Sequence, residues 1–292
     1  MKIQTQCVAC LLKRIIFETD LITDDKDIKD KAIKNACRII SENYSHNINS
    51  AEIATKIHKI VYDTIGSLDP YKNLKKQSNE IALSLIPQIR KIIDESNDRL
   101  KMSILCSIIG NNLDFGIDGA SSHPNELKKI FKKSIKEGFG YNDINKFKIL
   151  LGKSNKILFF SDNCGEIVFD KILCEELKIF NPNIFLTLVV KGEPILSDAT
   201  IDDAKYLRFN ETVDEIITTG CFAVGVDFKN IPKILYNKLK NCDLIICKGM
   251  ANYESFSDTS YKPIVYLLRT KCNSIADSMN IQINVNAIKV YE

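Results

Sequence analysis

Tryptophan is absent from this 292-residue chain, and histidine occurs only three times, as His46, His58 and His123. Because no histidine follows residue 123, the C-terminal part cannot by itself build a Ser-His-Asp or Cys-His catalytic site. A histidine-rich zinc site in that part is excluded for the same reason. Any chemistry there must use carboxylates, amides, lysine, thiols or the backbone.

Long apolar runs and a strong net charge are also missing. No run approaches the roughly 20 residues of a membrane helix, and the N-terminus lacks the features of a signal peptide, so we expect a cytoplasmic protein. Lysine and arginine number 40 against 37 acidic residues, a balance that favours neither nucleic acid nor membrane as a partner. The composition, 45% hydrophobic and 26% charged, is that of a globular protein and excludes disorder.

The ten cysteines do not form the pattern of a disulfide framework. Most lie within apolar runs, where a reduced cysteine acts as a small hydrophobic residue. Cys7 and Cys10 form an isolated CxxC pair, with Cys37 further along, which is typical of either half a metal site or a redox pair. The helical period around them favours packing of at least one thiol in a core, so metal binding and packing both stay open.

Helical periodicity dominates the first 110 residues. Apolar residues recur every three or four positions in five segments, at about 4–20, 25–44, 49–66, 74–96 and 100–109. Pro87 should kink or divide the fourth of these helices. Another amphipathic stretch covers residues 123–138. We therefore predict an all-helical domain over 1–110 and a helical connection over 111–150 that packs on the next domain.

From residue 151 onward the sequence changes to short apolar runs separated by helical stretches, two of them at 198–207 and 231–240. Six runs read as buried strands: KILFFSD, IFLTLVVKG, DEIITTG, DLIICKGMANYE, PIVYLLRTKC and AIKVYE. Continuous apolar strands that alternate with helices predict a parallel sheet covered on both faces. The expected fold class is α/β, with this domain over 151–292.

Polar residues follow several of these strands at the point where each one ends, where open α/β sheets bind ligands. Asp162 and Asn163 follow the first strand and Asp198 follows the second, and such oxygen ligands suit Mg²⁺ or Mn²⁺. Gly165 lets the chain turn into a helix whose N-terminus favours a phosphate, and Lys248 after the fourth strand adds a positive charge. Together these features indicate phosphoryl chemistry.

Ordinary local structure is the alternative explanation for each of these residues. Asp162, Asn163 and Asp198 all precede predicted helices and could simply be helix caps. Lys248 could simply be the residue at which a strand ends. The segment GNNLDFG at residues 110–116 ends a very apolar helix, so its polar side chains either form a cap and turn or reach the wall of the pocket.

Other function classes are weighed by the motifs that they require. The chain has no GxxxxGK[ST] and no GxGxxG after the first strand, which disfavours a P-loop nucleotidase and a nicotinamide enzyme. An S-adenosylmethionine-dependent methyltransferase would need a glycine-rich first loop, and this loop has a single glycine. A non-enzymatic metal or redox protein that uses Cys7, Cys10 and Cys37 is the other alternative.

The segments CxxCLL, GNNLDFG, SDNCGEIVFDK, VVKGEPILSDAT, IITTG and CKGMANYE together resemble the damage-control phosphatases, the family of domain of unknown function 89, in its archaeal-type branch. The resemblance covers essentially the full length. It implies a Rossmann-like three-layer α/β/α domain with a mostly parallel sheet, preceded by a helical domain. The activity implied is divalent-metal-dependent hydrolysis of phosphomonoesters of small, damaged or surplus phosphorylated metabolites, with one cation (Mg²⁺, Mn²⁺, Co²⁺ or Ni²⁺).

The resemblance also implies roles for individual residues, by motif position. The metal ligands fall on Asp162, Asn163 and Asp198, with Lys248 as a further catalytic residue. The substrate side is implied to comprise a second set of residues from both domains: Asn111, Asp114, Gly165, Glu166, Asn252 and Glu254. Glu254 stands where the eukaryotic branches usually carry Arg. We predict a small phosphorylated molecule as the partner and make no prediction of oligomeric state.

Overall fold

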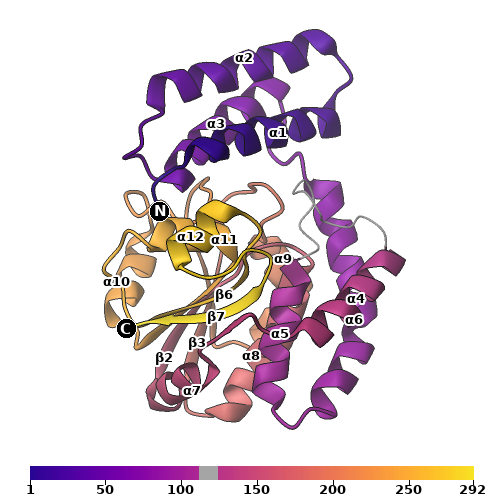
Figure 1. The fold of residues 1–292 in the computed structure, drawn as a ribbon, viewed down its shortest axis with the longest axis vertical. Coiled ribbons are helices and arrows are strands. Elements are labelled where there is room, and N and C mark those ends of the chain that lie inside the picture. Colours follow the sequence, from indigo (N-terminus) through magenta and orange to yellow (C-terminus); the bar gives the residue numbers. More distant parts are fainter. Residues whose placement is uncertain (112–123) are drawn as a thin grey trace.

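A seven-stranded sheet forms the centre of the protein in the computed structural model, which describes residues 1–111 and 124–292 (Figure 1). The strand order is β1-β7-β6-β5-β2-β3-β4. Every neighbouring pair is parallel except β6 and β7, so the sheet is mostly parallel, as predicted. The strands are β1 (Tyr141–Asn142), β2 (Lys156–Phe160), β3 (Phe185–Val190), β4 (Glu215–Thr218), β5 (Leu244–Lys248), β6 (Ile264–Arg269) and β7 (Asn286–Tyr291).

Helices cover both faces of this sheet. One face shares a hydrophobic core with α4 (Lys72–Asp94), α5 (Arg99–Gly110), α7 (Ile144–Lys153), α8 (Glu166–Phe180) and α9 (Ile201–Tyr206). The opposite face packs against α10 (Lys233–Asn241), α11 (Gly249–Phe256) and α12 (Asn273–Met279). A strand buried on both faces has no polar side, which explains the unbroken apolar runs of the sequence. The predicted three-layer α/β/α class is confirmed.

The first three helices form a separate unit, here called the helical lobe. They are α1 (Thr5–Ile22), α2 (Lys26–Asn43) and α3 (Ser50–Ile65), and they enclose their own small core around Ile15, Ile53 and Ile57. Figure 1 shows the lobe, in indigo and purple, at one end of the molecule beyond α11 and α12. A second apolar cluster joins Ala51 and Ala54 of α3 to loops of the sheet domain.

Helix α4 runs through Pro87 as a single element, so the division that the sequence suggested does not occur. Leu85, Ile89 and Ile93 recur at helical spacing and pack in the core of the sheet, and this burial outweighs the hydrogen bond that the proline removes. Both α4 and α5 thus share the core of the sheet, while α1–α3 do not. The division of the chain at residue 110 stays a prediction.

The segment 111–150 includes α6 (Pro124–Glu137), the short strand β1 and most of α7, which continues to Lys153. The bounds of the helical connection stay a prediction. β1 was not expected, because two residues are too few to show a strand period. It pairs with β7 at the sheet edge, where Gly140 N–H donates to the Asn286 carbonyl at 3.0 Å. The connection is therefore docked on the sheet.

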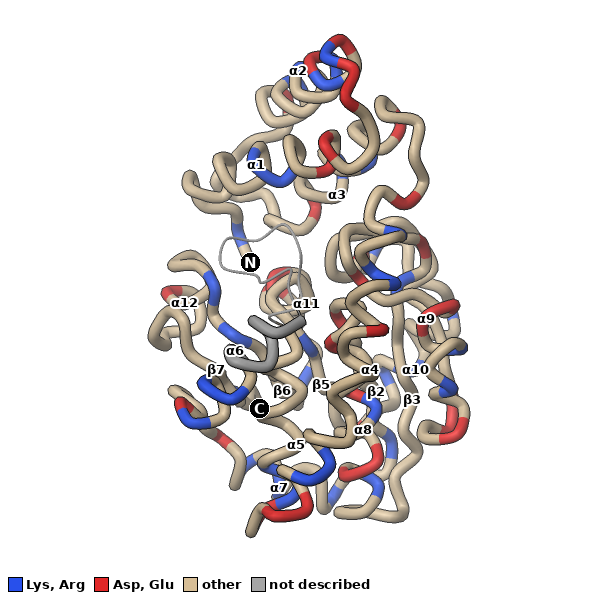
Figure 2. The backbone as a smooth tube through the Cα atoms, turned by 90° about the vertical axis from the view of Figure 1, so that its right-hand side faces the viewer, with Lys and Arg blue, Asp and Glu red and all other residues tan. Residues whose placement is uncertain are grey.

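Charged residues of both signs are scattered over the molecule, as Figure 2 shows for the lysines, arginines and acidic residues of the described segments. This distribution agrees with the nearly neutral charge balance. In residues 1–111 and 124–292, no helix has the length and apolar character to cross a membrane.

The cysteines differ in how deeply they are buried. Cys106, Cys164, Cys174 and Cys247 are buried, as expected for small hydrophobic residues, whereas Cys10 and Cys37 are exposed and Cys7 is half-buried against the core of the helical lobe. The structure thus agrees with the packing of one thiol of the CxxC pair.

Candidate active site

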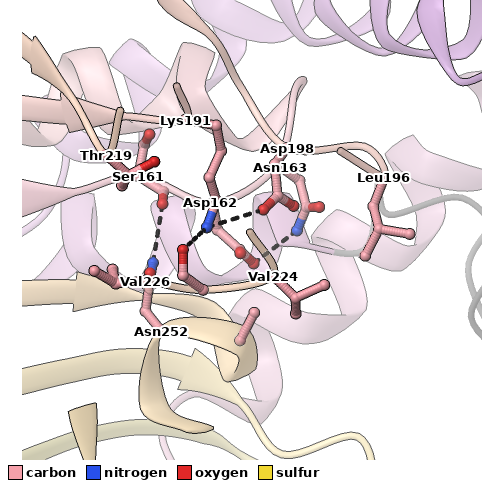
Figure 3. Close-up of polar contacts among 12 residues, drawn as sticks. Ser161, Asp162, Asn163, Lys191, Leu196, Asp198, Thr219, Val224, Val226 and Asn252 are labelled. Carbon is pink, nitrogen blue, oxygen red and sulfur yellow. Dashed lines mark hydrogen bonds and ion pairs between the residues drawn. The ribbon is translucent and has the colours of Figure 1, made fainter. Parts of the chain in front are cut away.

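Backbone pairing brings together the segments that follow β2 and β3. Asn163 and Asp198 form an antiparallel bridge, Cys164 N–H donates to the Ser197 carbonyl at 2.8 Å, and Ala199 N–H donates to the Asp162 carbonyl at 2.8 Å. Asp162, Asn163 and Asp198 are each at most 5% exposed. Figure 3 shows their side chains gathered at the ends of the strands.

None of these three residues is the N-cap of α8 or α9, the helices that follow them. The N-cap of α8 is Gly165, without a side-chain cap, and α9 begins only at Ile201 with Thr200 and Asp203 as a capping box. The capping explanation of Asp162, Asn163 and Asp198 is therefore wrong. Their burial without a capping role points to a function at this edge of the sheet.

Two amides hold the Asp162 carboxylate in place. Asn111, which follows α5, donates from Nδ2 to Asp162 Oδ2 at 3.1 Å and to Glu166 Oε2 at 2.6 Å. Asn163 donates to the same Asp162 oxygen at 2.7 Å, and its own Oδ1 accepts from the Ser197 hydroxyl at 2.6 Å. Asn111 thus reaches the site from the helical part, as the sequence suggested; Asp114 lies outside the described residues.

Lys248 lies in a fully buried polar cluster beneath the site. Its ammonium donates to Glu166 and to Asp170 Oδ1 at 2.8 Å, and also to Ser107, at 2.6 Å from Oγ and 3.2 Å from the carbonyl oxygen. Burial raises the pKa of Asp170 to about 6 although the Lys248 charge opposes this shift. Burial also opposes protonation of Lys248, but the Asp170 and Glu166 carboxylates outweigh it and raise the pKa of Lys248.

The predicted role of Lys248 in binding phosphate therefore stays a prediction, and its contacts favour another role. With four protein acceptors around its ammonium, Lys248 fixes Glu166, which in turn accepts from Asn111. Glu166 is 0% exposed and is not among the residues that line the pocket described below.

Lys191, the residue after β3, places a second positive charge at the site. The sequence motifs predicted no role for it. Its Nζ lies 3.3 Å from Asp198 Oδ2 and donates to the Gly225 carbonyl, and the side chain is 3% exposed (Figure 3). The same signal that identified Asp198, a polar residue at the carboxyl end of a strand, could have identified Lys191.

The remaining predicted substrate residues differ in what they contact. Asn252 Nδ2 donates to the Ser161 carbonyl at 3.0 Å and to the Lys248 carbonyl at 2.8 Å, so it holds two strand ends together. Glu254 lines the pocket, and burial raises its pKa to about 7 against the opposing effects of the Met1 amine and Ser50.

The start of α8 is held by the helical part of the chain. Gly165 adopts a φ of 79°, which favours glycine, and its N–H donates to Asn79 Oδ1 of α4 at 2.7 Å. This N–H of the predicted phosphate-binding helix end is therefore bonded within the protein. The contribution of Gly165 and Glu166 to substrate binding stays a prediction.

Gly249, at the start of α11, is expected to be essential for the position of Asp162. A Cβ atom there would lie 1.9 Å from Asp162 Oδ2, and the φ of 73° disfavours any other residue. Gly249→Ala should therefore displace the carboxylate and lower kcat/KM by about 10²-fold. The control is Gly152→Ala in α7, where nothing lies within 4 Å of the added Cβ. Equal activity of the two variants would contradict this prediction.

The site opens into a pocket of about 500 Å³ between the helical lobe and the strand ends. Asp162, Asn163, Asp198 and Asn111 line one part of it, and residues of α1, α3, α11, the start of α12 and several loops line the rest. In residues 1–111 and 124–292, no group of three or more His, Cys, Asp and Glu side chains is suited to hold a metal. A cation here would have two carboxylates and an amide, a donor set that fits a hard dication completed by water and substrate oxygens.

Three comparisons with known proteins point to the same family. The model of the damage-control phosphatase ARMT1-like domain matches residues 3–284. A damage-control phosphatase of Archaeoglobus fulgidus is 39% identical over 292 residues, covering all of both chains, and one of Pyrococcus horikoshii is 29% identical, covering 96% of this chain and 95% of that protein. The crystal structure of a DUF89 family protein from Pyrococcus horikoshii superimposes with a TM-score of 0.90 at 26% identity over the full length of both chains.

These similarities extend over the whole chain and include both the helical lobe and the sheet. Relatives that are named phosphatases support a phosphatase activity. The resemblance noted in the sequence motifs is confirmed: the chain belongs to the damage-control phosphatase ARMT1-like domain family.

Proposed function

We propose that this protein is a divalent-metal-dependent phosphatase that hydrolyses phosphomonoesters of small phosphorylated metabolites. The observation that supports it best is the backbone pairing of the segments after β2 and β3. Asp162, Asn163 and Asp198 thereby line one pocket, and none of them is the N-cap of α8 or α9. The family match favours this function over a methyltransferase and over a thiol-based metal or redox protein.

Asp162, Asn163 and Asp198 would hold the cation. When bound, such a cation offsets the charge that builds on the phosphoryl oxygens during transfer. Lys191 fixes Asp198 through its ion pair, and Asn111 fixes Asp162 through a hydrogen bond. The Asp162 carboxylate serves in this scheme either as a ligand or as the group that attacks phosphorus.

The test is hydrolysis of p-nitrophenyl phosphate by purified protein that has been treated with a chelator and dialysed. We expect no turnover without metal and turnover restored by at least one of Mg²⁺, Mn²⁺, Co²⁺ and Ni²⁺. Activity that persists unchanged in the chelator, or no activity with any of the four metals, would contradict the proposed function. A panel of small phosphomonoesters then ranks the substrates by kcat/KM.

A further inference from the structure

Polar side chains of the helical lobe line the pocket on the side away from the strand ends, and the imidazole of His58 is one of them. The sheet domain from residue 151 onward contains no histidine, so this imidazole reaches the pocket from α3 of the lobe. His58 is only 1% exposed, whereas His46 of the same lobe is exposed. A buried imidazole that lines a pocket is a candidate for proton transfer to a ligand.

Glu18 of α1 holds the imidazole ring in place. His58 Nδ1 lies 2.9 Å from Glu18 Oε1 and 3.0 Å from Oε2, and the Tyr71 hydroxyl donates to Oε1 at 3.3 Å. Glu18 and Tyr71 are both 0% exposed. Because a carboxylate only accepts, Nδ1 carries a proton. Within the described part of the chain, no hydrogen bond reaches the other ring nitrogen, Nε2, so Nε2 is the atom that can exchange a proton with a ligand.

The contacts of α3 place His58 near the loop that carries Asp198. Ala54, His58 and Tyr62 are four residues apart and therefore share one face of the helix. The Tyr62 hydroxyl accepts from the Leu196 N–H at 3.0 Å, and Leu196 packs against the hydrophobic cluster that contains Ala54. Leu196 stands two residues before Asp198 (Figure 3). His58 thus lies between two residues of α3 that contact this loop.

Helix α3 also holds a second loop of the pocket. The Val224 N–H donates to Thr55 Oγ1 at 2.9 Å, and Val224 lines the pocket. The helix that carries His58 is therefore tied to two pocket loops of the sheet domain by hydrogen bonds. A side chain on a helix fixed in this way can hold a reacting atom in a constant position.

The direction of a bound ester follows from the position of the pocket. The proposed function places the phosphoryl group at the strand ends, next to Asp162 and Asp198. Because the pocket lies between the strand ends and the lobe, the alcohol part of the ester extends toward the lobe. When the bond from phosphorus to the ester oxygen breaks, its electron pair stays on that oxygen, and a basic alkoxide leaves poorly without a proton. The step therefore needs a proton donor on the side of the lobe.

We propose that His58 is a further catalytic residue, the general acid that donates its Nε2 proton to the ester oxygen as the phosphorus–oxygen bond breaks. The alcohol leaves with this proton, and the phosphoryl group passes to the attacking water or to Asp162. The electron pair of the N–H bond stays on Nε2, and the neutral imidazole takes up a proton from the solvent before the next turnover. Glu18 is a positioning residue that fixes the ring through Nδ1. The inference rests on the proposed function, because it needs the phosphoryl group at the strand ends.

The experiment compares phenyl phosphate with p-nitrophenyl phosphate, two esters of similar shape. p-Nitrophenolate is a weak base that leaves without a proton, whereas phenolate is more basic and leaves faster with one. In His58→Asn, whose amide can keep the hydrogen bond to Glu18, the phenyl-to-nitrophenyl ratio of kcat/KM should fall about tenfold or more. Glu18→Gln should lower the same ratio to a smaller extent. The control is His46→Gln, at the exposed histidine of the lobe, which should leave the ratio unchanged.

A smaller fall in His58→Asn, with both esters losing activity alike, would overturn the inference, because a merely structural role affects every substrate equally. A ratio that falls in Glu254→Gln but not in His58→Asn would also overturn it. Glu254 is the rival donor, since it lines the same pocket and burial raises its pKa to about 7.

If His58→Asn fails to fold, the unaltered protein decides. Proton donation to the leaving oxygen predicts that kcat/KM for phenyl phosphate stays within about tenfold of that for p-nitrophenyl phosphate, and a larger difference overturns the inference. Failure of the proposed function has a separate signature, the absence of p-nitrophenyl phosphate hydrolysis with every metal, and that result overturns both proposals together.

Discussion

Asp162→Ala is expected to lower phosphatase turnover by about 10³-fold or more while the chain stays folded. The carboxylate lies where the segments after β2 and β3 pair, and both of its proposed roles, metal ligand and attacking group, need its oxygens. The fold should survive because Asn111 and Asn163 already reach Glu166 as a second acceptor, at 2.6 and 3.4 Å. Steady-state kinetics with p-nitrophenyl phosphate and thermal unfolding measure the two parts of this prediction.

The matched control is Asp202→Ala, which removes an exposed carboxylate of α9 that does not line the pocket. Its turnover should equal that of the unaltered protein. If Asp162→Ala kept normal turnover, the residues after β2 would have no part in the chemistry. If Asp162→Ala unfolded, Asp162→Asn would supply the measurement, because the amide keeps the shape of the side chain.

Lys248→Met is expected to have the largest effect on stability, a loss of about 3–5 kcal/mol in the free energy of unfolding at pH 8. The substitution leaves the fully buried carboxylates of Glu166 and Asp170 without their cation. The pKa of Asp170 is already raised to about 6 with Lys248 present, and it should rise further without the ammonium.

The sign of the pH dependence follows from this shift. A carboxyl group with a raised pKa in the folded state binds more protons than in the unfolded state, so its unfavourable contribution diminishes as the pH falls. The stability deficit of Lys248→Met should therefore be smaller at pH 5.5 than at pH 8, as measured by urea unfolding. Lys59→Met, which breaks an exposed pair with Asp63, is the control and should cost well under about 1 kcal/mol. If Lys248→Met lost as little stability as the control, the ion pairs of the buried cluster would contribute little to the free energy of unfolding.

The strand ends of the site could be predicted because they depend on local pattern. Continuous apolar runs identified β2, β3 and β5, and the residues that follow a parallel strand meet at one edge of the sheet whatever the rest of the fold. This rule is enough to select Asp162, Asn163 and Asp198 from the amino-acid sequence alone.

The partners of these residues could not be predicted, because they come from distant parts of the chain. Lys248 contacts Ser107, 141 positions earlier, and no local pattern relates the two. The choice between helix cap and functional site was equally open in the sequence, since the two differ only in where α8 and α9 begin. Two residues of β1 were too short to show a period.

Tyr62 and Thr55 of α3 anchor two loops of the pocket, so the helical lobe and the sheet domain contribute differently to the site. Hydrolysis is proposed for residues at the ends of β2 and β3, whereas helix α3 of the helical lobe holds two of the loops that line the pocket. We therefore expect substitutions of these two α3 residues to change the shape of the pocket while the strand-end residues proposed for the reaction stay in place.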